Sequence, residues 1–550
     1  MAITTPDRTS PLSLPLLLPV LALLLSWPLQ SDAATAPQDP AIERTLKARF
    51  DGDRTGTCVQ AAIVEPQGLR RADFCARTTD APKPQAAFEI GSVSKTFTAL
   101  LVADLIERGR WSLDDPIAKH LPAGTQVPRQ GDRQITVRDL VTHSSGLPAA
   151  PPSLQRGRQQ DPYAHLTEAQ LLADLASSPL QSPIGSRPVY SNFGMMVLSM
   201  AVARAEESGL EAALRERVFK PLGLKHAGLN PAGQTPGHLS TGEPTPPWTI
   251  TPNLAGIGML RMPLDDLAAY ARALLAPSGP LAPALRRVQQ PVAHGFAMNW
   301  LLSAHNGETL IGHEGGTGGF SSLVLLRPAK QQAVVILADT ALADLGSLGD
   351  LGLALLGLQP QPQAPRRAQP LPASLRDALS GDYDFMGQTL TLRPRAEGLE
   401  LQVTGQPAFA LGYDSRGDLY PLQAISALLA PQREPDGRVL RFAWRQGGGS
   451  VEVLRRGATL PKPSAQNPAW RDWAGTYPLV PGFELKVYER DGQLVVQGSG
   501  QPAVPVEVTG PDRVEVKALG LVIQFERDAQ RAVSGLVLQQ GGQTLKGPRQ

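Results

Sequence analysis

Hydrophobic and polar positions follow one pattern in the first two thirds of the chain and another in the last third. Segments such as TFTALLVADLIERG (96–109) and FGMMVLSMAVARAEE (193–207) have the spacing of amphipathic helices, and short strands lie between such segments. Beyond residue 380 the chain consists of short alternating runs such as TLTLRPRAEGLELQV (389–403), separated by Gly and Asp turns. The pattern predicts an α and β domain followed by a mostly β region.

The β region repeats itself. Residues 381–407 align with residues 475–502, and each copy begins with Gly-x-Tyr and ends with Gly-Gln-Pro. The stretch ATLPKPSAQNP (458–468) contains prolines and joins two copies of one β unit. Because each copy is short, a small barrel or sandwich is the natural way to close its edges.

A proline-rich stretch separates the two regions. In GLQPQPQAPRRAQPLPA (357–373) the spaced prolines cannot continue a helix or a central strand and favour an extended spacer. We therefore predict an α/β domain at 41–358, a linker at 359–373, and all-β domains at 374–458 and 466–550.

The N-terminus has the pattern of a secretory signal peptide. An arginine in MAITTPDRTS precedes the apolar run PLSLPLLLPVLALLLSWPLQ, and SDAATA follows with small residues at Ala34 and Ala36. An uncleaved membrane anchor is the alternative, but Pro15, Pro19 and Pro28 and the small residues favour cleavage near Ala36. We expect export to the periplasm or medium, with no stable membrane insertion afterwards.

The chain has two cysteines, Cys58 and Cys75. They lie equally far from the turn signal Pro66-Gln67-Gly68 in TCVQAAIVEPQGLRRADFCAR, so they should face each other across a hairpin. A cross-strand disulfide in an oxidising compartment follows as a hypothesis, and two buried free thiols are the alternative.

Composition narrows the class of partner. The chain has 550 residues, 42% of them hydrophobic and 19% charged, and a formal net charge of +2, so it is a folded protein of several domains without a basic stripe for nucleic acid. We expect a small-molecule or short peptide substrate. The histidines are scattered and the cysteines lack ligand spacing, so we expect no metal and no cofactor.

A serine and a lysine three residues apart lie in FEIGSVSKTFTA (88–99). On a helix they share one face, so the Lys95 amine would touch the Ser92 hydroxyl and could make it a nucleophile. A serine helix cap followed by a solvated lysine is the alternative.

Two later segments could complete such a site. In PVYSNFGMMV, Tyr190 and Asn192 can project the same way from an extended segment before a helix, and a tyrosine near an ammonium group loses its proton more easily. In LIGHEGGTGGFSSLVLL, glycines after His313 let a strand edge approach a ligand, and the Gly316 N–H beside that of Ser92 would form an oxyanion hole. The alternatives are that Tyr190 is a packing residue, that Asn192 is a helix cap, and that the glycines form a bulge between strands.

Taken in order, the three segments resemble the penicillin-recognising serine hydrolases, which include class C β-lactamases, D,D-peptidases, D-aminopeptidases and family VIII esterases. The family pattern of Ser-x-x-Lys, Tyr-x-Asn and Lys-Thr-Gly or His-x-Gly corresponds here to Ser92 to Lys95, Tyr190 to Asn192, and His313-Glu314-Gly315. The resemblance covers about residues 41–358 and extends to LDDPIAKHLP, ITVRDLVTHSSGLP and AGIGMLRMPLDDLAAYARALL.

The resemblance implies an antiparallel sheet flanked by helices and an acyl-enzyme mechanism. Ser92 would attack the carbonyl carbon, Lys95 and Tyr190 would move its proton as a coupled pair, and Asn192, His313, Glu314 and Gly315 would bind the substrate. The N–H groups of Ser92 and Gly316 would hold the oxyanion. We interpret His143 as structural, and Asp265 and Asp266 as first-turn carboxylates of a helix.

The third motif departs from that of β-lactamases, which hold the substrate carboxylate with a permanent cation and a hydroxyl. His313 and Glu314 supply neither, and an ionised Glu314 would repel a substrate carboxylate or could pair with a substrate amine, unless it points away from the site. A D-aminopeptidase or esterase is therefore favoured over a true β-lactamase or D,D-carboxypeptidase, and two β domains also follow the catalytic domain in D-aminopeptidases. A catalytically silent protein that binds cell-wall or other ligands is the non-enzyme alternative.

Overall fold

The computed structural model describes residues 38–550, apart from 79–80, 84, 157–160, 306, 435–437, 459–467, 481–482, 491–492, 499–502, 517–520, 529 and 541–542. The predicted signal peptide, residues 1–36, lies outside the described residues, as does most of the 458–468 stretch. In the part of the chain that is described, no helix has both the length and the apolar character needed to cross a membrane.

A six-stranded antiparallel sheet forms the centre of the α/β domain, in the order β2-β1-β12-β11-β10-β9. Its strands are β1 (Cys58–Glu65), β2 (Gly68–Cys75), β9 (Leu301–His305), β10 (Glu308–Gly316), β11 (Ser321–Arg327) and β12 (Gln332–Ala338). The beginning and the end of the domain meet in this sheet, because β1 pairs with β12 in a register that places Val59 opposite Ala338. Val59 and Ala338, which are 279 positions apart in the sequence, therefore share one core.

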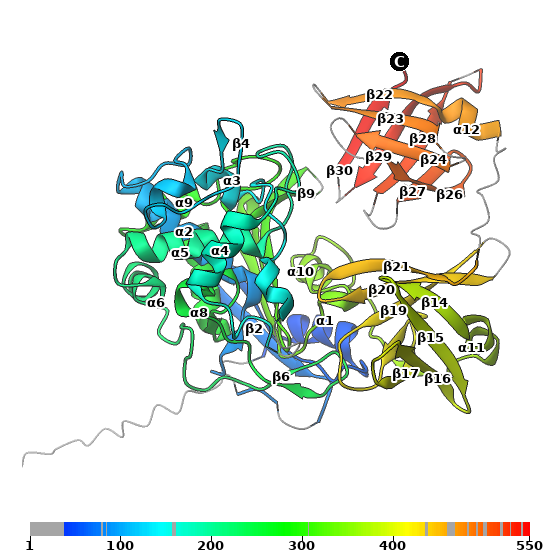
Figure 1. Cartoon of the computed structure of the whole chain (residues 1–550), viewed down its shortest axis with the longest axis horizontal. Coiled ribbons are helices and arrows are strands. Elements are labelled where there is room, and N and C mark those ends of the chain that lie inside the picture. Colours follow the sequence, from blue (N-terminus) through cyan, green and yellow to red (C-terminus); the bar gives the residue numbers. More distant parts are fainter. Residues whose placement is uncertain are drawn as a thin grey trace, which may run out of the picture. The chain divides into compact units, whose positions relative to one another are not determined.

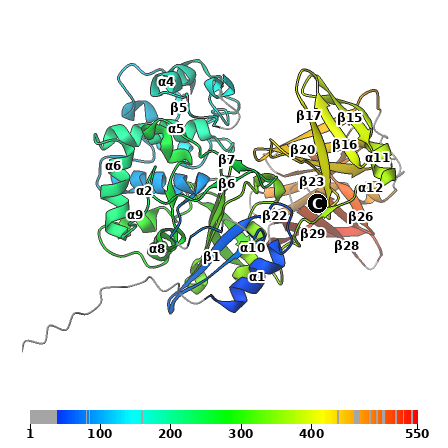
Figure 2. The same cartoon turned by 90° about the horizontal axis from the view of Figure 1, so that it is seen from below.

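Different helices bury the two faces of the sheet. In β12, Val334 and Ile336 belong to the same core as helices α1 (Pro40–Phe50) and α10 (Gly349–Leu355), whereas Val335 and Leu337 belong to the larger core of helices α2 (Ser94–Glu107), α5 (Asn192–Ala205) and α8 (Leu264–Leu275). Figures 1 and 2 show α1 and α10 close together and apart from α2, α5 and α8. An antiparallel sheet between helices is the predicted fold class, which the structure confirms.

The remaining elements of this domain are short. The helices are α3 (Val137–Val141), α4 (Glu168–Ser177), α6 (Leu210–Leu214), α7 (Lys220–Leu222) and α9 (Ala282–Arg287). The strand pairs are β3 (Phe88–Glu89) with β8 (Arg261–Met262), β4 (Arg129–Gln130) with β5 (Arg133–Gln134), and β6 (Gly237–His238) with β7 (Pro244–Thr245).

Helices α2 and α5 form where the sequence predicts helices, but they are more deeply buried than amphipathic helices. Every residue of α2 from Ser94 to Ala103 is buried, and so is every residue of α5 from Phe193 to Ala203. The reason is that the two helices pack on each other and on the neighbouring 3-10 turn Pro252–Ile257 (η5), so neither helix has a wide solvent face. Residues at the start of α2 are therefore held in a water-poor environment.

A disulfide joins Cys58 and Cys75. The two residues are opposite each other in the β1–β2 hairpin, whose turn lies at Pro66 and Gln67. This is the pairing that the alternation around the turn predicts.

Removing this disulfide should lower the free energy of unfolding by ~2–4 kcal/mol, because a cross-link between residues 17 apart restricts the unfolded chain. The comparison is between the wild-type protein and Cys58→Ala/Cys75→Ala in urea, each with and without reductant. Reductant should destabilise the wild-type protein alone, and a thiol titration of unfolded, unreduced wild-type protein should find no free thiol. Two free thiols would contradict the prediction.

The first β unit is a closed barrel. Its eight strands follow one another around the barrel, and β14 pairs with β21 to close it. They are β14 (Gly381–Phe385), β15 (Gln388–Arg395), β16 (Gly398–Val403), β17 (Ala408–Asp414), β18 (Leu419–Pro421), β19 (Leu428–Arg433), β20 (Val439–Gln446) and β21 (Gly449–Arg455). Closure removes the exposed edges that a short sheet would otherwise present.

The second β unit forms around one core from a four-stranded and a five-stranded sheet. The strands are β22 (Gly475–Val480), β23 (Phe483–Arg490), β24 (Gln493–Gly498), β25 (Val504–Pro505), β26 (Glu507–Gly510), β27 (Arg513–Val516), β28 (Leu521–Arg527), β29 (Val533–Gln540) and β30 (Gln543–Pro548). The repeat seen in the sequence has a structural counterpart. The hydroxyl of Tyr383 donates to the carbonyl of Leu379 and that of Tyr477 to the carbonyl of Trp473, both at 2.7 Å and both at the end of a short helix, α11 (Ala373–Leu379) or α12 (Pro468–Trp473).

The proline-rich stretch is extended but closely bound. Residues 368–369 add a short strand, β13 (Ala368–Gln369), beside β17. The buried guanidinium group of Arg366 lies 3.0 Å from Asp414 of the barrel, and Arg54 of the α/β domain bonds the same carboxylate at 3.2 Å. A buried ion pair that loses one partner is costly, so these contacts hold the linker in place.

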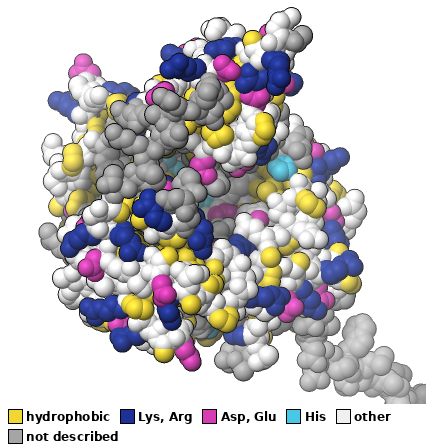
Figure 3. All heavy atoms as spheres, turned by 90° about the vertical axis from the view of Figure 1, so that its right-hand side faces the viewer, with side chains coloured by type: hydrophobic (Ala, Val, Ile, Leu, Met, Phe, Trp, Pro, Cys, Tyr) yellow, Lys and Arg dark blue, Asp and Glu magenta, His cyan; other side chains and the backbone are white. Residues whose placement is uncertain are grey.

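The surface carries both signs of charge. On the face shown in Figure 3, Lys and Arg side chains lie interspersed with Asp and Glu side chains, and neither sign forms a continuous stripe. This agrees with the formal net charge of +2.

Candidate active site

Ser92 lies on a tight turn at the start of α2. The turn is a 3-10 segment, Gly91–Val93, and Ser92 is its partly exposed residue, whereas Gly91 and Val93 are buried. The N-cap of α2 is Val93 and makes no side-chain cap bond, so Ser92 does not act as a helix cap. The local backbone presents its hydroxyl instead.

Lys95 lies one turn after Ser92 and is fully buried. Its Nζ atom is 2.8 Å from Ser92 Oγ and donates to the carbonyl oxygen of Ile257 at 2.6 Å. Burial disfavours the charged form, so the pKa of Lys95 lies well below that of a solvated lysine. A neutral amine at this distance can accept a proton from the hydroxyl.

Tyr190 also lies near the Lys95 amine. The Lys95 Nζ atom is 5.0 Å from the centroid of the phenol ring. The residue is 43% exposed, while its ring packs near His143 and His313, with centroid distances of 4.4 and 6.4 Å. Desolvation raises the pKa of the Tyr190 phenol, and an interaction with Ser92 partly opposes the rise. The direction is opposite to that expected for a tyrosinate base.

Asn192 opens helix α5, with Ser191 as its N-cap. The Ser191 hydroxyl accepts from the Gly194 N–H at 2.9 Å, so the serine between Tyr190 and Asn192 has a structural role. The amide nitrogen of Asn192 lies 3.5 Å from the hydroxyl of Tyr163, while its buried Oδ1 has no partner among the described residues. This oxygen is an acceptor that a ligand could use.

His313 lies on β10 and faces Tyr190 and Lys95. Its Nδ1 is 2.7 Å from the carbonyl oxygen of Glu314, so the proton sits on Nδ1 and Nε2 carries the free lone pair. Burial, followed by the charge of Lys95, lowers the pKa of His313 to about 4. At neutral pH the ring is therefore uncharged and offers an acceptor rather than a cation.

Glu314 does not join this cluster, although the sequence analysis counted it as a substrate-binding residue. Successive residues of a strand point to opposite faces of the sheet, so Glu314 points toward α10 when His313 points toward Tyr190. A Cβ atom on Gly349 would lie 2.8 Å from Glu314 Oε1, and Ser347 and the Gly349 backbone partly oppose the rise in the pKa of Glu314 that burial causes. Pairing of Glu314 with a substrate amine is therefore not supported, and its charge does not repel a substrate carboxylate.

Two close backbone contacts require glycine where β10 meets the Ser92 turn. A Cβ atom on Gly315 would lie 2.0 Å from the carbonyl oxygen of Ile90. Gly91 has φ +49°, and a Cβ atom there would lie 2.5 Å from the Gly316 nitrogen. The turn that carries Ser92 and the end of β10 that carries Gly316 thus approach each other closely at Gly91.

Sequence reasoning overlooked part of the surroundings of Tyr190. His143, interpreted as structural, packs directly against the phenol ring. Tyr163 and Trp248 stand edge to face, with centroids 5.4 Å apart, beside Asn192. Both aromatic residues lie outside long helices and strands, where no hydrophobic period marks them.

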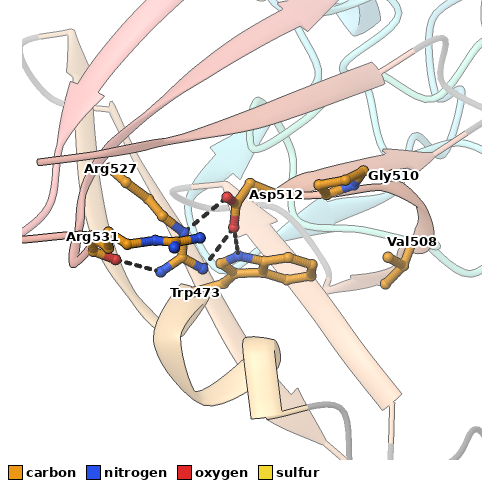
Figure 4. A pocket seen from close by; sticks show the side chains of 7 residues that line it. Trp473, Val508, Gly510, Asp512, Arg527 and Arg531 are labelled. Atoms are coloured by element: carbon orange, nitrogen blue, oxygen red, sulfur yellow. Dashed lines mark hydrogen bonds and ion pairs between the residues drawn. The ribbon is translucent and has the colours of Figure 1, made fainter.

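A hollow of about 530 Å³ lies in the last β unit, away from Ser92 in the sequence. Figure 4 shows Asp512 between Arg527 and Trp473. The Asp512 carboxylate accepts from Arg527 at 2.8 and 2.7 Å and from the Trp473 indole at 2.9 Å, while Arg527 also donates to the carbonyl of Arg531 at 2.7 Å. These groups satisfy one another and tie two turns to α12, so their role is structural.

Comparisons with known proteins agree with the geometry around Ser92. Residues 57–355 match the family model described as Beta-lactamase. The chain is 30% identical over 351 residues to "Penicillin-binding protein 4" of Amycolatopsis lactamdurans, covering 58% of this chain and 88% of that protein. It is 30% identical over 152 residues to the D-alanyl-D-alanine-carboxypeptidase/endopeptidase AmpH of Escherichia coli K12, covering 28% and 39%, and 22% identical over 271 residues to Protein flp of Staphylococcus aureus MW2, covering 46% and 53%.

Proposed function

Because the chain belongs to the β-lactamase family and is a serine hydrolase of the penicillin-binding type, we propose that it cleaves an ester or amide through an acyl-enzyme on Ser92. One observation carries this proposal: the Nζ atom of the fully buried Lys95 lies 2.8 Å from Ser92 Oγ. An amine deprived of water is a base at the pH where a solvated lysine is an acid.

The directions of the two pKa shifts support different roles for Lys95 and Tyr190. The lowered pKa of Lys95 suits it to take the Ser92 proton, and the raised pKa of Tyr190 keeps its phenol protonated. Ser92 Oγ then attacks the carbonyl carbon while its proton moves to Lys95 Nζ. Tyr190 passes a proton to the leaving group and regains one from Lys95.

The remaining groups would bind the substrate. The N–H groups of Ser92 and Gly316 would hold the oxyanion, and each such donor typically lowers the barrier by ~3 kcal/mol. Asn192 and the backbone at Gly315 would orient the acyl group. Water would then attack the acyl-enzyme carbonyl while Lys95 Nζ takes its proton, and return of that proton to Ser92 Oγ would break the ester bond and release the acid.

The substrate class that we propose is an ester, a D-amino-acid amide or a short peptide without a carboxylate at the third motif. The neutral His313 ring supports this, since it accepts a hydrogen bond and offers no cation. A D,D-carboxypeptidase is the second candidate. The similarity to AmpH favours it. Glu314 points away from the site, so its charge is no objection to a substrate that carries a carboxylate.

We further propose that the protein acts outside the cytoplasm. The signal-like residues 1–36 and the Cys58–Cys75 disulfide support export. Sequencing the N-terminus of the mature protein tests this directly, and a mature chain that begins at Met1 would contradict it.

A hydrolysis panel tests the substrate class. Short acyl esters and D-amino-acid amides should be cleaved with a kcat/KM ~10²-fold above that of nitrocefin-like lactams, which carry a carboxylate. His313→Lys should shift this ratio toward the lactams ~10-fold or more, because a hydrogen bond to a charged group is worth ~1.5–3 kcal/mol. Glu314→Gln, on the opposite face of the sheet, is the matched control and should leave the ratio unchanged.

Two results would contradict the assignment. Lactams cleaved as fast as esters by the wild-type protein would reject the proposed substrate class. A ratio that responds to Glu314→Gln and not to His313→Lys would show that the carboxylate, not the imidazole, faces the substrate.

A further inference from the structure

His143 lies directly beneath Tyr190. It is 2% exposed, and its ring packs between Tyr190, at 4.4 Å, and Phe296, at 5.7 Å. It follows the C-terminal end of α3, where its own N–H donates to the carbonyl of Leu140 at 3.2 Å. The imidazole thus packs directly against the phenol ring.

Two hydrogen bonds tie His143 to the residues on either side of Tyr190. The N–H of Val189 donates to the His143 carbonyl at 2.7 Å. The N–H of Ser191 donates to His143 Nδ1 at 3.3 Å. The backbone before and after Tyr190 is therefore fixed to one residue, so the phenol cannot shift along its segment while both bonds are made.

The backbone of His143 supports a specific role. Its φ is +56°, in the left-handed region that residues with a Cβ atom seldom adopt. Such conformations persist where the surroundings determine them, and they cluster at functional sites. Here the conformation allows the carbonyl and the ring of one residue to reach Val189 and Ser191 together.

The hydrogen bond from Ser191 also fixes the tautomer. Nδ1 accepts, so the ring proton is on Nε2, which is buried and has no partner among the described residues. Burial is the main reason that the pKa of His143 lies well below its ordinary value. A neutral ring suits this place, because protonation of Nδ1 would set a donor against the Ser191 N–H.

We propose that His143 is the positioning residue of Tyr190: it holds the phenol at Ser92 through the Ser191 N–H bond and the ring contact. The proposal rests on the function proposed for Tyr190. His143 acts through Tyr190 and does not touch the reacting atoms.

Two substitutions separate the acceptor from the ring. His143→Phe keeps an aromatic ring and loses Nδ1, so the buried Ser191 N–H loses its partner. His143→Asn loses the ring but sets Oδ1 where Nδ1 was, and asparagine tolerates a positive φ. We expect kcat for ester hydrolysis to fall ~10–100-fold in His143→Phe with KM within ~2-fold, since small misplacements of a catalytic group have effects of this size. The Asn variant should recover kcat to within ~5-fold of the wild-type value.

A double-mutant cycle tests whether His143 acts through Tyr190. In the Tyr190→Phe background, His143→Phe should change kcat less than ~3-fold, because the hydroxyl that it positions is already absent. His120→Phe is the control for the loss of a packed histidine in the same domain. His120 stacks on Trp111 at 4.0 Å, and its replacement should leave kcat unchanged.

The outcomes are distinct. Additive effects of His143→Phe and Tyr190→Phe, or a wild-type kcat in His143→Phe, overturn the proposal while leaving the function of Ser92 intact. A wild-type kcat in Tyr190→Phe overturns it together with the proposed role of the phenol. Should His143→Phe not fold, His143→Gly, which suits a positive φ and also lacks the acceptor, takes its place in the cycle with the same expected result.

Discussion

Replacing Ser92 by alanine should abolish acyl-enzyme formation and lower kcat/KM for the best ester substrate at least ~10³-fold. The remaining groups, Lys95 and Tyr190, would have no hydroxyl to activate. Intact-protein mass spectrometry with a fluorescent penicillin or a phosphonate should find one covalent adduct on the wild-type protein and none on Ser92→Ala. The variant should unfold at the wild-type temperature, because the hydroxyl caps no helix.

Ser94 provides the matched control, since it lies on the same turn but has a structural role. It is fully buried, and its Oγ accepts from the N–H of Leu260 at 3.1 Å. Ser94→Ala should lose ~1 kcal/mol of stability and still form the adduct. An adduct on Ser92→Ala, or the loss of the adduct in Ser94→Ala alone, would place the nucleophile elsewhere.

The features of the protein that could be predicted from sequence are those that spacing along the chain determines. Ser92 and Lys95 share a helix face because they are three residues apart, and Cys58 and Cys75 pair because they are equidistant from a turn. The β repeat is of the same kind, since the equivalent Tyr383 and Tyr477 make equivalent hydrogen bonds. Each inference needed only spacing along the sequence.

The outcome for Glu314 shows what spacing along a strand could and could not decide. Alternation alone states that His313 and Glu314 face opposite sides of β10, so both cannot line one pocket. It does not state which side meets Ser92, because both faces of this sheet are covered by helices. Only the tertiary packing of β10 against the Ser92 turn, at Gly315 and Gly91, decides the question.

The part of the candidate active site that is built from loops could not be predicted from the sequence. His143, Tyr163 and Trp248 lie outside long periodic segments, and their side chains meet only when the fold is complete. The burial of α2 was underestimated for the same reason. A helix covered by other elements on most of its surface has no polar face to mark it, and the low pKa of Lys95 depends on that burial.

Lys95→Met should lower kcat/KM ~10²–10⁴-fold, which is the contribution usual for a general base. Methionine fills a similar volume without an amine, so Ser92 would remain in place but keep its proton. Lys47→Met is the control: Lys47 is an exposed lysine of α1 that pairs with Glu43 at 2.6 Å, and its replacement should leave kcat/KM unchanged. Activity retained in Lys95→Met would transfer the role of base to another group.

The same substitution gives a thermodynamic test that does not depend on activity. In the unfolded chain Lys95 is protonated up to a pH of about 10.4, whereas burial lowers its pKa in the folded protein. Between the two pKa values the unfolded state binds more protons, so this residue makes wild-type stability rise with pH until about 10.4 is reached. The free energy of unfolding of the wild-type protein minus that of Lys95→Met should therefore increase from pH 7 to pH 10 in urea titrations. A difference that is flat or falls with pH would mean that Lys95 stays charged in the folded protein, and an ammonium group could not take the proton from Ser92.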